Sequence, residues 1–111
     1  MGALTSAVSG MEAASLRLDV AANNIANSST PGFQPSEVAL AATAGGGVSA
    51  RVVPGQAPPT IAGLPANEQP SGTDLIQEMA TVLEAPLGYA ANARVVRAQD
   101  EATATLLDTF A

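Results

Sequence analysis

The chain has 111 residues and a formal net charge of −6 at pH 7, with a sequence pI near 4.1. This acidic balance argues against a nucleic-acid-binding protein, which needs a basic face. Cysteine and histidine are both absent from the sequence, which removes disulfides, thiolate metal ligands and the commonest general base. Hydrophobic residues make up 47% but aromatic residues only 3%, and alanine supplies much of the apolar fraction. Because alanine buries little area, we expect a monomer of marginal stability.

The spacing of apolar residues predicts one helix over residues 3–27. Apolar side chains recur there at alternating spacings of four and three, with Ser15 as the single polar member of the stripe. We interpret this stripe as a helix seam available for pairing or assembly. Its apolar members are Leu4, Val8, Met11, Leu18, Ala22 and Ile25.

The middle of the chain, residues 28–72, has a different composition. It holds seven of the eight prolines and the triplet Gly45-Gly46-Gly47. Such a segment cannot sustain a helix, and its few apolar pairs allow at most one or two short strands. The stretch "VSARVV" at 48–53 alternates well enough for one edge strand. The glycine triplet is interpreted as a flexible turn, because no lysine follows to complete a phosphate loop.

Helical spacing returns in residues 73–111, with Asp74 as the expected N-cap. Pro86 lacks an N–H and costs about 3 kcal/mol inside a helix, and Gly88 adds about 1 kcal/mol. We therefore expect a kink or break there, leaving helical stretches at 74–85 and about 88–110. The seam positions of this segment are Leu75, Met79, Val82, Tyr89, Val96 and Leu107.

Together these segments predict a mainly α fold in three parts: an N-terminal helix (1–27), a Gly/Pro-rich extended region (28–72) and a C-terminal helix (73–111). Two helices with matching heptad stripes most naturally pair as a coiled coil. A lone pair would leave alanine-rich flanks exposed, which favours packing between subunits.

Nothing in the sequence indicates catalysis. Asp100 and Glu101 are adjacent on a predicted helix and point about 100° apart, while Asp74 and Glu78 are explained by helix-start electrostatics. A serine or threonine nucleophile would find no histidine or lysine base. We therefore predict that the protein is not an enzyme and has no cofactor, no metal site and no small-molecule substrate. The short patterns "MGALTS" and "NSS" fit lipidation and glycosylation signals only as chance matches.

A membrane role is the main alternative from another class. No apolar run approaches the roughly 18 residues needed to span a bilayer. An amphipathic helix lying on a membrane surface requires a cationic polar face and bulky apolar residues opposite, whereas this chain is acidic and alanine-rich. The N-terminus also lacks the basic and apolar regions of a cleaved signal peptide. Export, if it occurs, is expected without the usual signal.

The strongest local signal is "ANNIANSSTPGF", residues 22–33. Asparagine is a mediocre helix former, because its amide competes for nearby backbone groups. A left-handed Asn27 at the helix end and a type II turn at 31–32 would explain part of this stretch. They leave Asn23 and Asn24 unexplained. We interpret these two amides as donors and acceptors for packing against other backbones.

These residues resemble a known family, the bacterial flagellar rod and hook proteins. The stretch "LRLDVAANNIANSSTPGF" (16–33) is similar to the N-terminal motif of that family. The segment "GTDLIQEMATVLEAPLGYAANARVVRAQDEATATLLD" (72–108) resembles its partner helix. Between them, "GGGVSARVVPGQAPPTI" (45–61) is similar to the short middle region of the proximal-rod branch of the family.

The resemblance implies a structural axial subunit of the flagellar basal-body rod, in which terminal helices form a coiled coil and pack into a torque-transmitting tube. It implies export by the flagellar type III apparatus without a cleaved signal. The implied partners are other rod proteins and further copies of this chain, with the membrane ring, the export gate or the hook side as further contacts; a hook-side or minor axial component is the alternative. The motif positions carried over are Asn23, Asn24, Ile25, Ala26, Asn27, Thr30, Pro31, Gly32 and Phe33 at the helix end, with Leu75, Glu78, Met79, Tyr89, Asn92 and Val96 in the partner helix.

Overall fold

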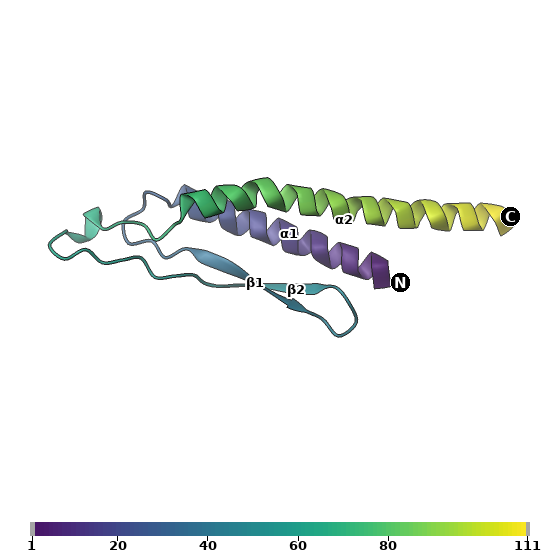
Figure 1. Cartoon of the computed structure of the whole chain (residues 1–111), viewed down its shortest axis with the longest axis horizontal. Coiled ribbons are helices and arrows are strands. Elements are labelled where there is room, and N and C mark those ends of the chain that lie inside the picture. The colour runs from purple at the N-terminus through teal and green to yellow at the C-terminus, as the bar shows by residue number, and fades with distance from the viewer. Residues whose placement is uncertain (1, 111) are drawn as a thin grey trace.

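The computed structural model describes residues 2–110 and shows two long helices with a β-hairpin beside them (Figure 1). Helix α1 spans Gly2–Ala26 and helix α2 spans Leu75–Phe110. Between them lie strand β1 (Ser36–Ala42), strand β2 (Val48–Pro54) and a short 3-10 turn, η1 (Ala66–Glu68). The prediction of a mainly helical protein with few short strands is confirmed.

The molecule is elongated, measuring 76 × 26 × 14 Å. Helix α1 lies in the middle, with α2 on one side and the hairpin on the other (Figure 1). The two helices run antiparallel, because Asn24 of α1 is bonded to Thr73, just before α2, whereas Gly10 meets Asn92 further along α2. Only α1 is covered on both sides, so most of the surface of α2 and of the hairpin faces outward.

Small side chains form the contact between the two helices. Ala7, Ala14 and Ala21 are buried at heptad spacing, and Ala21 is only 1% exposed. At Gly10 the helices come so close that an added Cβ would lie 2.5 Å from Asn92 Nδ2. The seam within the chain therefore lies one residue earlier than the expected stripe through Val8. Small residues occupy the seam positions because they let the two helix backbones approach closely.

Helix α2 continues through Pro86, so the predicted break into two helical stretches is wrong, whereas the alternative of a kink there stays a prediction. The structure has one helix from Leu75 to Phe110 with Pro86 inside it. Figure 1 shows a single continuous ribbon. Ala85, beside the proline, is 2% exposed and borders the same small cavity as Ala14 and Leu18 of α1. Packing against α1 on both sides of the proline holds the helical turns in place despite the lost hydrogen bond.

The start of α2 agrees with the sequence pattern. Asp74 Oδ1 accepts a hydrogen bond from the backbone N–H of Gln77 at 3.2 Å. The predicted N-cap is therefore confirmed, and it satisfies one of the N–H groups that a helix start leaves without an intrahelical partner.

The hairpin is antiparallel, with Ser36 opposite Pro54 and Ala42 opposite Val48. The expected strand at 48–53 is confirmed as β2, whereas its partner β1 was not singled out, since "SEVALAA" alternates only weakly. The glycine triplet forms the turn, and Gly46 and Gly47 adopt positive φ angles of 90° and 85°. Gly47 also lies against α1, where an added Cβ would be 2.5 Å from Ser9 Oγ.

The two helices differ in length, at 25 residues for α1 and 36 for α2. Their pairing begins where the C-terminal end of α1 lies beside the N-terminal end of α2. The C-terminal turns of α2 therefore extend past the N-terminal end of α1, as Figure 1 shows.

Candidate assembly site: the junction at the end of α1

The end of α1 is closed by hydrogen bonds from Asn27. Its Nδ2 donates to the carbonyl oxygen of Asn23 at 2.9 Å, and its Oδ1 accepts from Thr30 Oγ1 at 3.0 Å. The expected left-handed Asn27 is wrong, because no non-glycine residue among 2–110 has a positive φ. The side-chain amide satisfies the helix end instead, so the backbone needs no strained conformation.

The turn after the helix end is as predicted. Gly32 has a φ of 67°, and the Phe33 N–H donates to the Thr30 carbonyl oxygen at 3.2 Å. Pro31 precedes the glycine, which is the arrangement of a type II turn. The turn reverses the chain so that Pro35 and Ser36 return along α1.

Asn24 joins α1 to the start of β1. Its Nδ2 donates to the Ser36 carbonyl oxygen at 2.8 Å, and its Oδ1 accepts from the Ser36 N–H at 3.0 Å. The side chain thus pairs with a backbone as a neighbouring strand would. Asn24 is 1% exposed, and no buried side-chain polar atom in the described part of the chain lacks a partner. The expected packing of this amide against another backbone is met within the chain, so both of its polar ends are already occupied.

The segment leading into α2 is held at the same place by two hydroxyl groups. Thr73 Oγ1 donates to the Asn24 carbonyl oxygen at 3.0 Å, and Ser71 Oγ donates to the Asn27 carbonyl oxygen at 2.9 Å. Two of the carbonyls at the end of α1 are satisfied in this way. The contact ties residues far apart in sequence, which fixes α2 relative to α1.

Backbone pairing completes the junction. The Gly72 N–H donates to the Phe33 carbonyl oxygen at 2.8 Å, and the Gly32 N–H donates to the Pro70 carbonyl oxygen at 3.2 Å. An added Cβ on Gly72 would lie 3.0 Å from Pro35 Cδ and 3.1 Å from the Phe33 oxygen. Glycine is therefore needed at position 72, because the segment 33–35 approaches its backbone closely and Pro58 Cα would lie 3.2 Å from the same added Cβ.

We call the bonded set of α1 end, β1 start and α2 lead the junction; its side-chain contributors are Asn24, Ser71 and Thr73, which bond to backbone groups of Ser36, Asn27 and Asn24 respectively. These groups are amides and hydroxyls, which give directional bonds without net charge. The partners of Asn24 were not predicted from the sequence. The stretch "SGTD" before α2 was an available signal, since serine and threonine favour such local bonds to backbone.

The remaining predicted positions are distributed over the surface. Asn92 lies at the helix seam, where its Nδ2 donates to the Gly88 carbonyl oxygen at 3.0 Å and faces Gly10. The larger seam residues lie beside the alanine seam and are half-buried or exposed, so their role in assembly stays a prediction. The half-buried ones are Leu4, Met11, Leu18, Ile25, Val82 and Val96, and the exposed ones are Val8, Ala22, Leu75, Met79, Tyr89 and Leu107.

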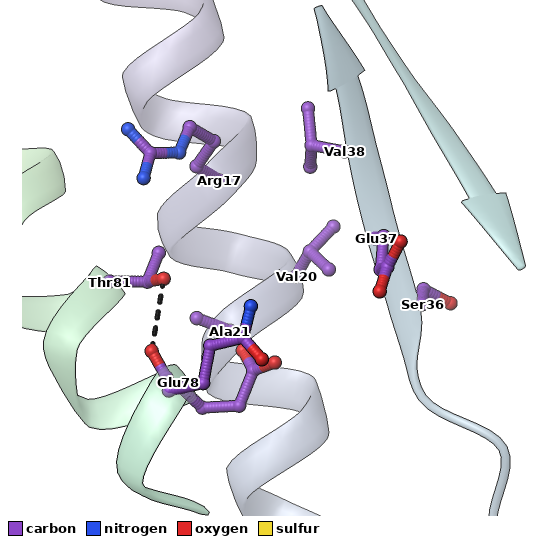
Figure 2. A pocket seen from close by; sticks show the side chains of 9 residues that line it. Arg17, Val20, Ala21, Ser36, Glu37, Val38, Glu78 and Thr81 are labelled. Carbon is purple, nitrogen blue, oxygen red and sulfur yellow. Dashed lines mark hydrogen bonds between the residues drawn. The ribbon is translucent and has the colours of Figure 1, made fainter. Parts of the chain in front are cut away.

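A groove of about 270 Å³ lies between α1, β1 and the first turns of α2 (Figure 2). Val20 points from α1 toward the side of β1 that carries Val38, whereas Arg17 points toward α2. There Arg17 pairs with Glu84 at 3.8 Å. The groove is thus the space between three packed elements, with charged side chains at its edges.

No group of three or more acidic, histidine or cysteine side chains that could hold a metal is found within residues 2–110. Over the same described stretch, neither long helix is apolar enough to cross a membrane.

The molecule is an elongated helical hairpin with a fixed junction and large exposed apolar side chains. Residues 4–34 match the family model described as "Flagella basal body rod protein". These residues cover nearly all of α1 and the turn that follows, so the similarity to that family is confined to this N-terminal part of the chain. No curated protein matches the chain at a significant level. The resemblance of residues 72–108 lies outside the matched segment and stays a prediction.

Proposed function

We propose that this protein is a structural axial subunit of the bacterial flagellar basal-body rod, assembling helically with other rod proteins and transmitting motor torque toward the hook and filament. The observation that carries the proposal is the family match over residues 4–34. The matched segment includes Asn24 and Asn27, which together with Ser71 and Thr73 hold the two helices in a fixed relation.

The shape of the molecule supports an assembled state. Large apolar side chains are exposed along both helices, including Val8, Ile76 and Leu83. Exposed apolar area of this extent is typical of protein surfaces that bind neighbours. Two helices parallel to a 76 Å long axis can pack side by side into a tube, and aligned helices resist torsion better than units joined by loops.

The proposed partners are other rod proteins and further copies of this chain. The proposed location is the basal body, reached through the flagellar type III apparatus. Within the rod we propose the proximal part, on the resemblance of residues 45–61 alone. A hook-side or minor axial position is distinguished from it by the first experiment below.

The direct test is to isolate intact hook–basal bodies and measure by mass spectrometry whether this chain co-purifies in fixed proportion to other rod proteins. We expect it to be present and to resist mild acid extraction together with the rod. Basal bodies arrested before hook assembly should still contain it. Its presence only in completed hooks would indicate the hook-side position, and its absence from both preparations would contradict the axial assignment.

A paired variant test connects the structure to this function. Asn24→Ala removes both bonds to Ser36, whereas Asn23→Ala alters an exposed neighbour on the same helix turn. We expect the Asn24 variant to reduce swimming and incorporation into basal bodies, and the Asn23 variant to do so much less. Equal effects of the two would show that the junction geometry is not what the assembly requires.

A further inference from the structure

Within the described residues 2–110, no other segment covers the C-terminal end of α2. Because Gly10 meets Asn92 in the antiparallel pair, the N-terminal end of α1 lies level with about residue 100 of α2. The end of α2 extends beyond it (Figure 1), and residues 101–110 are all exposed. We call this segment the overhang. It is regular helix to Phe110, so its side chains have defined directions.

The overhang continues the face by which α2 packs on α1. Heptad steps from the buried Ala85 lead through Asn92 to Leu106, and steps from Val82 lead through Val96 to Phe110. Where α1 lies alongside, this face carries Ala85, Asn92 and Val96, which are buried or half-buried. Beyond α1 it carries large residues, and Leu106, Leu107 and Phe110 are 57%, 66% and 80% exposed. The face therefore suits another helix lying antiparallel to α2, as α1 does.

The chain itself offers such a helix surface. Leu4, Val8 and Met11 form a stripe on α1 one position beyond its buried stripe, and Val8 is 41% exposed. Residues 2–11 carry no charged side chain, and the first turn of α1 has no acidic residue. The positive end of the α1 dipole is thus not matched by an acidic side chain of its own first turn.

Charge favours this surface over a second overhang. The overhang contains Glu101 and Asp108 and no cation. Two overhangs side by side would bring four carboxylates together. Against the N-terminal turns of α1, the same carboxylates gain from the helix dipole and meet no acidic side chain of residues 2–11.

We propose that the overhang of one copy packs antiparallel against the Leu4–Val8–Met11 stripe of α1 in a second copy. The second copy is parallel to the first and displaced along the long axis. Two different surfaces are joined, so the contact repeats without closing and generates an open array. This inference rests on the proposed function and adds the self-contact that would build the array.

Cysteine cross-linking tests the contact directly, because the natural chain contains no cysteine. Full-length Val8→Cys and Leu107→Cys proteins are mixed under mild oxidation, and mixed disulfides are quantified by mass spectrometry. Within one chain, position 8 lies level with the region of Asn92, so position 107 is roughly 20 Å further along α2. That separation is far beyond disulfide reach, so the product reports contact between copies.

We expect the Val8–Leu107 mixture to give clearly more product than two comparisons. The first is Leu107→Cys alone, which reports pairing of two overhangs. The second is Leu107→Cys mixed with Ala44→Cys, which reports random collision with the exposed hairpin turn. If the mixture exceeds neither comparison, the proposed contact is wrong. If the overhang cross-links best to itself, the occupant is a second overhang instead.

A matched pair of substitutions tests which face of the overhang makes the contact. In the Phe110→Cys background, Leu107→Asp is expected to reduce the mixed disulfide with Val8→Cys by roughly tenfold or more, since burial of one leucine is lost. Thr105→Asp adds the same charge on the opposite side of the helix and should leave the yield unchanged. Circular dichroism of both variants verifies equal helix content. Equal losses for the two would overturn the assigned face.

The same cross-link in isolated basal bodies separates this inference from the proposed function. Presence of the chain without a Val8–Leu107 product would keep the axial role and reject the contact. A product with the purified chain, combined with absence from basal bodies, would keep the contact and reject the role.

Discussion

The two ends of this molecule are built in different ways. At the junction, amide and hydroxyl groups of Asn24, Ser71 and Thr73 bond three chain segments together. At the overhang, Leu106 and Phe110 are exposed and no other segment of the described chain covers them. The comparison indicates that the fold is fixed at one end of the helical hairpin while the other end is left available to a neighbour.

The chemistry of each end suits its role. Hydrogen bonds are directional and costly to leave unmade when buried, so they define one geometry. Apolar contact is non-directional and depends on area removed from water. A junction of buried polar bonds therefore sets the angle between α1 and α2. An apolar overhang accepts a partner helix without requiring that partner to match individual polar groups.

The largest effect on stability is expected between the two ends, at Pro86. Pro86→Ala restores a donor to the Val82 carbonyl inside a continuous helix and should raise the free energy of unfolding by up to about 3 kcal/mol. Urea unfolding followed by circular dichroism measures it. Pro59→Ala, in the exposed extended segment, is the control and should lower stability slightly, because it frees the unfolded chain. A Pro86→Ala protein of lower stability would mean that α1 packs specifically on the proline ring.

The junction should respond next most strongly. Asn24→Ala removes two hydrogen bonds and leaves the Ser36 N–H and carbonyl without their partner, so we expect a loss of about 2 kcal/mol. Asn23→Ala should cost much less, since the bond that Asn23 Oδ1 accepts from Asn27 Nδ2 is exposed. The two variants are compared by midpoint and slope of urea unfolding. Similar losses would contradict the special position of Asn24.

The overall fold was within reach of the sequence. Heptad spacing defined both helices, Asp74 marked the start of α2, and the glycine triplet marked a turn before the strand at 48–53, although not the hairpin that it closes. These features depend on local chemistry, so a short stretch of sequence is enough to read them. The stripe of α1 that faces α2 was misplaced by one residue. Larger side chains suggested the seam, whereas close approach at Gly10 selected alanines instead.

The junction could be predicted only in part. Asn23 and Asn24 stood out as poor helix formers without a local reason, but the partner of Asn24 lies 12 residues away in a strand that alternates weakly. A long-range bond to a backbone group leaves no trace in side-chain pattern. The continuity of α2 through Pro86 could not be predicted from the sequence either. Proline inside a helix normally causes a kink or a break, and only the packing of α2 against α1 keeps the helix continuous here.

A smaller gain in stability is expected at Gly88, within α2. No atom lies within 4 Å of an added Cβ there, so Gly88→Ala should raise the free energy of unfolding by about 1 kcal/mol through helix propensity. Gly10→Ala has the same propensity gain, but its Cβ would meet Asn92 Nδ2 at 2.5 Å. Thermal melting of the two variants should therefore show a rise for Gly88→Ala and a smaller rise or a fall for Gly10→Ala. Equal rises would mean that Asn92 moves aside without loss.

The smallest effect on the monomer, and the sharpest test of the comparison, is expected at the overhang. Leu106→Ser with Leu107→Ser changes two side chains that are already exposed, so the free energy of unfolding should change by less than about 0.5 kcal/mol. Incorporation into basal bodies should nevertheless fall sharply, because the surface offered to a neighbour is lost. Asn24→Ala should behave differently. It should lower the free energy of unfolding strongly, and its reduced incorporation into basal bodies should be a consequence of that lost stability. If the overhang variant instead unfolds as readily as Asn24→Ala, the C-terminal turns of α2 belong to the folded core of a single chain, and the division of the molecule into a fixed end and an available end does not hold.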